Sequence, residues 1–320
     1  MNKFPYESLS REILLKDKSD PKGTFGKTPE ERSAKELLHL GIINLDKPSG
    51  PTSHQVADFL KKILELKKVG HSGTLDPGVT GVLTIALGRS TKVIQALLTA
   101  GKEYVCLMHI HKLIDEKTIK KTINEFIGKI TQMPPVKSAV KRQLRERTIY
   151  YIDLLEIDGQ DVLFRVGSQA GTYIRKLCYD IGQKLGVGAH MAELRRTRVA
   201  DFNEDSVFTL REVQDAYHYY KKGNEKFLKK MITPIEKAVS HLPKIWVQDS
   251  AVKSLSHGRD LAVPGIAKVE KCVEFDKPAA VLTLKGELIG FGIALLSGEE
   301  IINAEKGLVV ELHKVLISEV

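Results

Sequence analysis

The chain has 320 residues, which is long enough for about two domains that each bury a core. Its 42% hydrophobic and 28% charged residues are ordinary for a globular protein and exclude collagen-like, low-complexity and disulfide-rich chains. The formal net charge is +9, and no run of about 18 apolar residues predicts a membrane span.

The first 40 residues alternate in charge sign and are rich in Gly, Pro, Lys and Asp. We expect residues 1–40 to form an irregular arm packed on a larger body, with a disordered tail as the alternative. The stretch begins with charged residues and lacks the apolar segment of a secretory signal, so no such signal is expected.

From residue 41 the pattern predicts regular elements. Residues 41–47 predict a short strand that ends in a Pro/Gly turn, and Thr52 or Ser53 is expected to cap a helix. The apolar face of that helix is expected to contain Val56, Phe59, Leu60, Ile63 and Leu64. Residues 71–81 are dense in turn formers and predict a loop, which a buried strand over 82–87 follows.

The central part of the chain continues as a mixture of helices and strands. The helices expected next lie over 91–98, 116–128, 172–185, 208–220 and 224–240. The strands expected among them lie over 103–111, 148–157 and 162–168. The last two strands meet at Asp158-Gly159, which is a strong hairpin signal.

After Pro243 the sequence changes to short apolar runs between Gly and Pro. These runs predict strands over 244–249, 271–276, 279–285, 287–295 and 307–317. The fold class is therefore α+β, with the arm, a central domain over 41–240 and a small β-rich module over 243–320.

The excess positive charge lies in the middle of the chain. Residues 41–240 hold 32 basic and 22 acidic side chains, whereas residues 241–320 hold 9 and 11. The two basic clusters are Lys137, Lys141, Arg142, Arg145 and Arg147, and Arg195, Arg196 and Arg198. Dense Lys and Arg favour a polyanion such as nucleic acid, although a solvated face explains any single run equally well.

Asp76 lies in the turn Gly-Thr-Leu-Asp-Pro-Gly, which by itself is most often only structural. Here the turn precedes a buried strand, so the carboxylate is expected on a stiff loop, as a nucleophile is presented. Arg175 is expected in the first turn of a helix, where the dipole favours anions. We therefore expect it to pair with a carboxylate, with a surface arginine as the alternative.

Tyr104 begins a predicted strand and shares a face with Cys106 and Met108. Core packing explains this position, and a platform on which a nucleobase stacks is the functional alternative.

Other chemistries find little support in the sequence. His109 and His111 share one strand face, but no third ligand has suitable spacing, so no metal is expected. Residues 88–92 lack the order of a P-loop, and Ser72 is not in a nucleophile elbow. The three distant cysteines, Cys106, Cys178 and Cys272, favour reduced thiols and a cytoplasmic protein.

Six ordered motifs resemble the TruB family of pseudouridine synthases, in particular its archaeal and eukaryotic dyskerin-like branch: LDKPSGPTSH, GHSGTLDPGVTGVL, AGKEYV, MPPVKSAVKR, GTYIRKL and HMAELRRTRV. Residues 244–269 are similar to a PUA domain. The resemblance covers about residues 40–320, and dyskerin-like proteins also carry an arm packed on the PUA domain. It implies a pseudouridine synthase domain followed by a PUA RNA-binding domain, with no cofactor.

The resemblance also implies roles for single residues. Asp76 is the implied nucleophile, Tyr104 is implied to stack on the target base or take its C5 proton, and Arg175 to pair with the catalytic carboxylate. His71 is implied to help the target strand flip, and Lys47 with Pro48 to brace the catalytic loop. The implied substrate and RNA contacts are His71, Leu194, Lys47, Lys137, Lys141, Arg142, Arg145, Arg195 and Arg196. Of these, Lys137, Lys141 and Arg142 lie in the motif MPPVKSAVKR, which resembles a mobile thumb loop that clamps substrate RNA.

Asp76, Tyr104 and Arg175 together suit the conversion of uridine to its C5 glycoside. This reaction needs a base that is swung out of the stack and no cofactor. An ionised Asp76 would attack ribose C1′ or base C6, and the sequence leaves both open. The implied partners are RNA, namely tRNA, rRNA and H/ACA guide RNA, and small H/ACA ribonucleoprotein proteins, without a membrane. Guide-selected rRNA is favoured over the T-loop uridine of tRNA.

Two other functions compete with this hypothesis. A non-catalytic RNA scaffold with a PUA domain would have no need of Asp76, Tyr104 and Arg175 together. An aspartate-nucleophile hydrolase would need a second carboxylate near Asp76, and the loop contains none. One departure from the family concerns residues 112–117, where many dyskerin-like sequences have a Gly-Asp turn, so partner contacts there are expected to differ.

Overall fold

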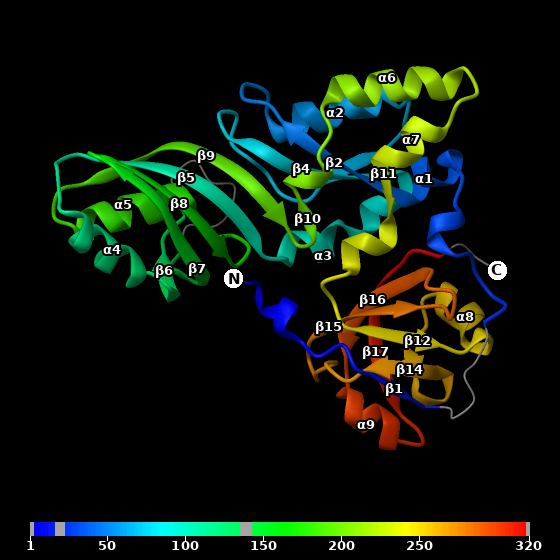
Figure 1. The fold of residues 1–320 in the computed structure, drawn as a ribbon. Helices are drawn as coiled ribbons and strands as arrows, with labels where there is room; N and C mark the ends of the chain where they lie inside the picture. Colours follow the sequence, from blue (N-terminus) through cyan, green and yellow to red (C-terminus); the bar gives the residue numbers. More distant parts are fainter. Residues whose placement is uncertain (1–2, 17–22, 135–142, 318–320) are drawn as a thin grey trace.

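A computed structural model describes residues 3–16, 23–134 and 143–317 (Figure 1). Its helices are α1 Ala34–Leu40, α2 Ser53–Ile63, α3 Ile94–Thr99, α4 Glu116–Asn124, α5 Ile174–Lys184, α6 Leu210–Lys221, α7 Lys226–Met231, α8 Asp249–Ser256 and α9 Gly298–Asn303. Its strands are β1 Ile13–Leu15, β2 Gly41–Lys47, β3 Val69–His71, β4 Thr80–Leu87, β5 Lys102–Ile110, β6 Gly128–Gln132, β7 Arg145–Asp158, β8 Asp161–Ser168, β9 Ala189–Val199, β10 Phe202–Asn203, β11 Ile232–Pro234, β12 Lys244–Val247, β13 Leu261–Ala262, β14 Ile266–Glu270, β15 Pro278–Leu282, β16 Leu288–Ala294 and β17 Leu308–Val315.

The central domain is built on one long mixed sheet. Its strand order is β11-β2-β4-β9-β5-β8-β7-β6, with β3 paired to β4 and β10 to β9. The β4–β9 pairing is parallel, and the other neighbours along this path are antiparallel. Because β4 and β9 lie in the middle of this order, the sheet joins the start and the end of the central domain at one place.

Different helices cover the two halves of this sheet. Around β2 and β4, the apolar sides of α1, α2 and α6 form one hydrophobic cluster, and Figure 1 shows α2 and α6 above these strands. Around β5, β7 and β8, α4 and α5 form a second cluster with the strands. The burial of apolar area in both clusters stabilises the sheet at about 25 cal/mol per Å².

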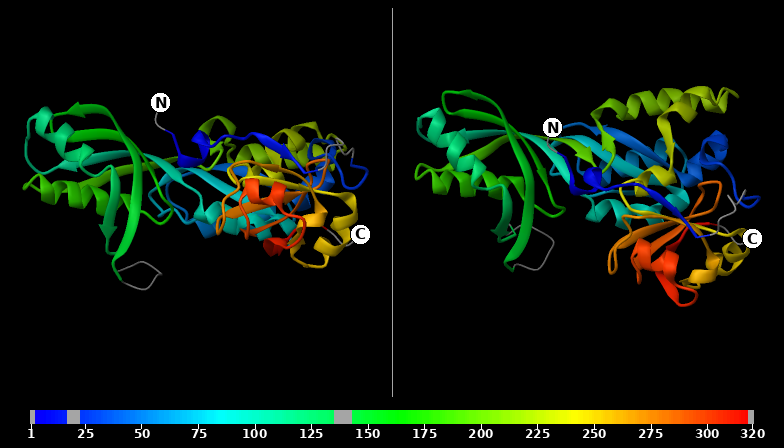
Figure 2. Two further views of the ribbon diagram at one scale, coloured as in Figure 1. Left: turned by 90° about the horizontal axis from the view of Figure 1, so that it is seen from below. Right: turned by 60° about the horizontal axis from the view of Figure 1, so that its bottom comes forward.

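The C-terminal part folds around a second sheet. Its strand order is β1-β14-β12-β15-β16-β17-β13, and β1 comes from the N-terminal arm. Ile13, Leu14 and Leu15 pair antiparallel with Glu270, Val269 and Lys268, so the arm adds an edge strand to this module. Figure 2 shows the arm running along the module.

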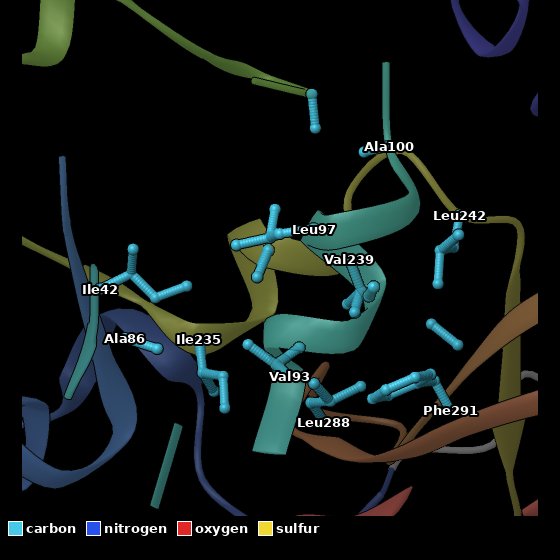
Figure 3. Packing of buried hydrophobic residues seen from close by; sticks show 14 of the residues in the cluster. Ile42, Ala86, Val93, Leu97, Ala100, Ile235, Val239, Leu242, Leu288 and Phe291 are labelled. Carbon is cyan, nitrogen blue, oxygen red and sulfur yellow. The ribbon is translucent and has the colours of Figure 1, made fainter. Parts of the chain in front are cut away.

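A third hydrophobic cluster joins the two domains (Figure 3). Leu97 and Ile235 of the central domain and Leu288 and Phe291 of β16 all belong to it, and each is buried. Because large apolar interfaces hold domains in fixed relation, the C-terminal module is not a loosely tethered appendage. The boundaries at residues 41 and 243 stay predictions, and α1 packs in the central core although it precedes residue 41.

The structure confirms most predicted elements and corrects five predictions. The arm is not irregular throughout, because β1 and α1 lie within residues 1–40. Phe59 of α2 is 44% exposed and is not part of the buried face. Residues 224–240 are not one helix, because α7 ends at Met231 and β11 follows as far as Pro234, which cannot continue a helix. Residues 91–98 divide into a 3₁₀ turn and α3, and the run predicted over 271–276 is a turn that follows β14.

Candidate active site

Asp76 lies in the loop that connects β3 to β4. Leu75 and Val79, on the two sides of Asp76 in the loop, are buried, whereas Asp76 itself is exposed, as is the adjacent Pro77. The backbone amide of Val79 donates to the carbonyl of Asp76 (3.0 Å), which closes a tight turn. The loop is thus anchored on both sides of a carboxylate that remains open to solvent.

Residues of β2 and α2 hold this loop from one side. Lys47 at the end of β2 is fully buried, and its Nζ donates to the carbonyl oxygens of Pro48, Pro77 and Val79 at 2.8–3.0 Å. The hydroxyl of Ser53 accepts from the amide of Leu75 (2.7 Å). Lys47 therefore braces the catalytic loop, as the family resemblance implies, but its burial contradicts the expected contact with RNA.

Arg196 of β9 also holds the Asp76 loop in place. Its guanidinium donates to the carbonyl oxygens of Val82 (2.8 Å) and Gly73 (3.2 Å), and only 1% of the residue is exposed. The expected RNA contact of Arg196 is therefore wrong, because the side chain points into the protein. Gly81 allows the backbone of β4 to lie close to the backbone of β9 at Arg196, since a Cβ at Gly81 would lie 2.2 Å from the Arg196 carbonyl oxygen.

The carboxylate of Asp76 is paired with the guanidinium of Arg175. The side chains are 55% and 57% exposed, so this ion pair faces solvent and is accessible to a substrate. Arg175 is in the first turn of α5, as expected, and the pairing hypothesis is confirmed. The contact joins Nη2 of Arg175 to Oδ2 of Asp76, and such a charge-assisted hydrogen bond orients the carboxylate.

Gln132 is a residue of the site that the sequence analysis missed. It ends β6, is 2% exposed, and its amide both accepts from the Tyr173 backbone amide (3.0 Å) and donates to the Tyr173 carbonyl (3.2 Å). Tyr173 directly precedes α5, so this contact fixes the start of the helix that carries Arg175. A glutamine at a strand end carries no signal of this role in one sequence.

Tyr104 and Leu194 come from neighbouring strands of the sheet. In β5 and β9, Tyr104 pairs with Arg196, and Cys106 with Leu194. Tyr104 and Leu194 are half-buried and pack against the cluster that contains Cys106 and Met108. Both interpretations of Tyr104 therefore find support, since the residue packs on the core and also keeps an accessible part.

The comparisons with known proteins place this geometry in a family. Residues 61–117 and 111–174 match the TruB family pseudouridylate synthase N-terminal domain, and residues 175–240 match the tRNA pseudouridylate synthase B C-terminal domain. A protein of Methanopyrus kandleri named probable tRNA pseudouridine synthase B is 51% identical over 316 residues, 98% of this chain and 93% of that protein. The chain belongs to the TruB family of pseudouridine synthases.

Further matches extend over the rest of this TruB-family chain. Residues 2–57 match the DKCLD (NUC011) domain and residues 243–316 a PUA domain. A solved structure described as a Cbf5-Nop10-Gar1 complex contains a chain that is 50% identical, with a TM-score of 0.94 over 98% of this chain and 96% of that one. A second, described as an H/ACA RNP bound to a substrate RNA containing 2'-deoxyuridine, is 48% identical, with a TM-score of 0.92 over 99% and 98%. The dyskerin-like branch is thereby confirmed.

His71 of this TruB-family chain ends β3, next to the catalytic loop. Its Nδ1 accepts from the amide of Gly73 (3.4 Å). Burial, with the positive charge of Arg196 nearby, lowers the pKa of His71 below 6.5. The neutral form of the imidazole, with its proton on Nε2, is thereby favoured, and the role of His71 at the target strand stays a prediction.

The structure divides the basic clusters into different roles. Arg195 pairs with Asp46 (2.9 Å) and Glu204 (2.5 Å), and Arg198 pairs with Glu7 (3.0 Å), so both arginines have carboxylate partners within the protein. Arg145 begins β7 and is half-buried, and its RNA contact stays a prediction. Lys137, Lys141 and Arg142 lie outside the described residues, and their RNA contacts stay predictions.

Histidines 109, 111 and 190 gather at the ends of β5 and β9. His109 contacts Asp161 (2.7 Å) and His111 contacts His190 (3.0 Å), so their ring nitrogens are engaged pairwise. Within residues 3–16, 23–134 and 143–317, no group of three or more His, Cys, Asp or Glu side chains is arranged to hold a metal ion. In the same ranges, every helix is too short or too polar to span a bilayer.

Proposed function

We propose that this chain is an RNA pseudouridine synthase that uses Asp76 as its nucleophile and acts as the catalytic subunit of an H/ACA-type ribonucleoprotein. The observation that carries the proposal is the solvent-exposed Asp76–Arg175 pair on a loop braced from below, in a chain of the TruB family. A rigid, open carboxylate is what a nucleophile needs, and a scaffold protein has no use for it.

In the proposed reaction, each residue around Asp76 has a separate role. Isomerisation breaks the bond between ribose C1′ and base N1 and forms one between C1′ and C5, and the C5 proton is lost. Asp76 attacks the nucleotide, while Arg175 keeps its carboxylate oriented. Tyr104 and Leu194, on the adjacent strands, offer an aromatic and an apolar surface for the swung-out base.

Two features of the chain support a ribonucleoprotein rather than an enzyme that acts alone. The first is the arm, which pairs with the PUA module and is matched by the DKCLD domain. The second is the similarity over nearly the whole chain to proteins solved in a Cbf5-Nop10-Gar1 complex and in an H/ACA RNP with substrate RNA. We propose that guide RNA and small H/ACA proteins are partners of this chain too.

The relatives named probable tRNA pseudouridine synthase B support a second substrate. Thermococcus onnurineus has one that is 54% identical over 97% of this chain and 93% of that protein. We propose that the T-loop uridine of tRNA is also modified, without a guide. The division into an arm over 1–40, a catalytic domain over 41–240 and a PUA domain over 243–320, and a cytoplasmic location, complete the proposal.

One experiment separates these substrates. Purified protein is incubated with a tRNA transcript alone, and then with H/ACA guide RNA, target RNA and the partner proteins, and pseudouridine is mapped in each RNA. We expect product in the guide-selected target that depends on the guide, and weaker product in the T-loop. Efficient T-loop modification with no response to the guide would overturn the ribonucleoprotein assignment, and no product in either would overturn the synthase.

A further inference from the structure

Arg196 is a buried cation whose hydrogen bonds, among the described residues, go to backbone carbonyls rather than to a carboxylate. Its guanidinium donates to the carbonyl oxygens of Val82 and Gly73, and Tyr104 is its partner on the neighbouring strand. Its neighbours on β9 differ, since Arg195 and Arg198 each contact acidic side chains. Burial of a charge without an opposite charge is costly, and here it lowers the pKa of Arg196.

The contacts of Arg196 join two separate parts of the site. Gly73 lies in the loop that carries Asp76, three residues before it, and has a φ of +132°. Tyr104 lies on β5, where it is the cross-strand partner of Arg196. Directly opposite residues of an antiparallel pair have their Cβ atoms about 5 Å apart on one face of the sheet. Arg196 therefore donates to the loop of Asp76 and lies beside Tyr104 on the neighbouring strand.

We infer that Arg196 is a positioning residue of the isomerisation, which acts through Gly73 and Tyr104 to hold the Asp76 loop and the Tyr104 ring in one fixed arrangement. The inference rests on the proposed function. A hydrophobic residue of similar length could fill the volume of Arg196, but it could not donate to a loop carbonyl on one side and reach a phenol on the other.

This role has a consequence for one step of the reaction. After C1′ bonds to C5, that carbon carries both the ribose and its original proton. The C5–H bond then breaks and its electron pair restores the C5=C6 double bond, while the C6=N1 π pair moves to N1, which takes up a proton. The C5 proton leaves to a base or to water. If the Tyr104 ring loses its orientation, the base is held less well at this step, so loss of the C5 proton becomes more rate-limiting.

The test compares Arg196→Met with Arg198→Met, a matched control. Both variants remove a guanidinium from the interior side of β9, but Arg198 contacts Glu7, Tyr6 and Asp201 rather than the catalytic loop. With uridine or 5-deuterouridine at the target position, we expect kcat of Arg196→Met to fall by about 10²-fold and its C5 isotope effect to exceed that of the wild type. The RNA Kd should stay within about twofold.

The control variant tests the alternative that Arg196 only stabilises the fold. Arg198→Met is expected to lower the melting temperature while kcat and the isotope effect stay at their wild-type values. Equal losses of kcat in both variants, with an unchanged isotope effect, would show that Arg196 only stabilises the fold and would overturn the inference.

Arg196→Lys covers the case in which the Met variant does not fold. It keeps the charge, but its one nitrogen cannot take the places of both Nε at the Val82 carbonyl and Nη2 at the Gly73 carbonyl. We therefore expect a folded protein with a reduced kcat and a raised isotope effect. Wild-type values in this variant would overturn the inference. A wild-type protein that makes no pseudouridine would instead refute the proposed function, which keeps the two failures distinguishable.

Discussion

The site has two layers that differ in exposure and in charge balance. In the open layer, Asp76 and Arg175 form an ion pair that is more than half exposed. In the buried layer beneath it, Lys47 and Arg196 are at most 1% exposed, and they donate to backbone carbonyls of the Asp76 loop and of β4. The comparison shows two uses of positive charge at the site. In the proposed function the exposed pair takes part in the reaction, and the two buried cations fix the loop that carries Asp76.

The first prediction concerns the open layer. Arg175→Lys keeps the charge but replaces the planar guanidinium, whose Nη2 contacts Oδ2 of Asp76, with a compact ammonium that cannot reproduce this directional contact. We expect turnover to fall by about 10²–10³-fold, the scale of removing one well-placed donor. Single-turnover kinetics at saturating RNA measures the loss. An unchanged melting temperature is part of the prediction, because the pair is exposed, and a large drop in stability would assign Arg175 to the buried layer.

The second prediction concerns the packing of the buried layer. Gly81 has a φ of +99°, and a Cβ there would lie 2.2 Å from the Arg196 carbonyl oxygen. Gly81→Ala should therefore lower the free energy of unfolding by about 2–3 kcal/mol, through backbone strain and steric overlap together. Urea unfolding measures this value.

Gly128→Ala is the control for that measurement. Gly128 has a similar φ of +104°, but no atom lies within 4 Å of a Cβ at this position. We expect only the backbone strain, about 1–2 kcal/mol. Equal losses in the two variants would show that the close approach of β4 to Arg196 contributes nothing to stability.

The third prediction concerns the pH dependence of stability. Burial lowers the pKa of Lys102 from 10.5 to about 7, while its Nζ donates to the carbonyls of Leu97, Leu98 and Ala100. Between these two pKa values the unfolded chain binds more protons than the folded one. The contribution of Lys102 to stability therefore rises with pH through this window, by at most about 1.4 kcal/mol per unit.

Lys102→Met isolates this contribution, because the variant lacks the titrating group. The free energies of unfolding of wild type and variant are compared at about pH 6.5 and about pH 9.5, and the difference in favour of the wild type should grow. A difference that is the same at both pH values would mean that Lys102 titrates alike in the folded and unfolded chain.

The smallest predicted effect is that of Arg195. Asp46 and Glu204 occupy its guanidinium, so it is not free to neutralise a phosphate. We expect Arg195→Met to change the RNA Kd by about twofold or less and to leave the salt dependence of binding unchanged. If the slope of log Kd against log salt instead decreased by about one in Arg195→Met, Arg195 would contact a phosphate of the RNA, as the charge pattern predicts.

The sequence allowed the open layer to be predicted better than the buried one. Asp76 and Arg175 stand in specific motifs, and the pairing implied by the family resemblance is present in the structure. The charge pattern treated Arg195, Arg196 and Arg198 as one basic cluster. Successive side chains of a strand point to opposite faces, which separates Arg195 from Arg196 and Arg198. Arg196 and Arg198 share a face but contact different parts of the chain, Gly73 and Glu7. The strand β9 itself was not predicted from its many charged residues.

Long-range contacts explain the rest of what was missed. Gln132 fixes the start of α5 from 41 residues away, and Ser53 fixes Leu75 from 22 residues away. Neither residue type is distinctive at its position, so no local pattern indicates such a contact. Pro234 in the sequence indicates a helix break, but the apolar spacing on both sides of it favoured one helix over 224–240.

The most direct test of the account measures both product and proton release from one protein. Asp76→Asn is nearly isosteric and removes only the carboxylate charge, and the target uridine carries tritium at C5. At RNA saturation, the wild type should release one tritium for each pseudouridine formed, whereas the variant should bind RNA with a wild-type Kd and release tritium at least about 10⁴-fold more slowly. Tritium release and pseudouridine formation by Asp76→Asn at the wild-type rate would contradict the central claim that this carboxylate performs the isomerisation.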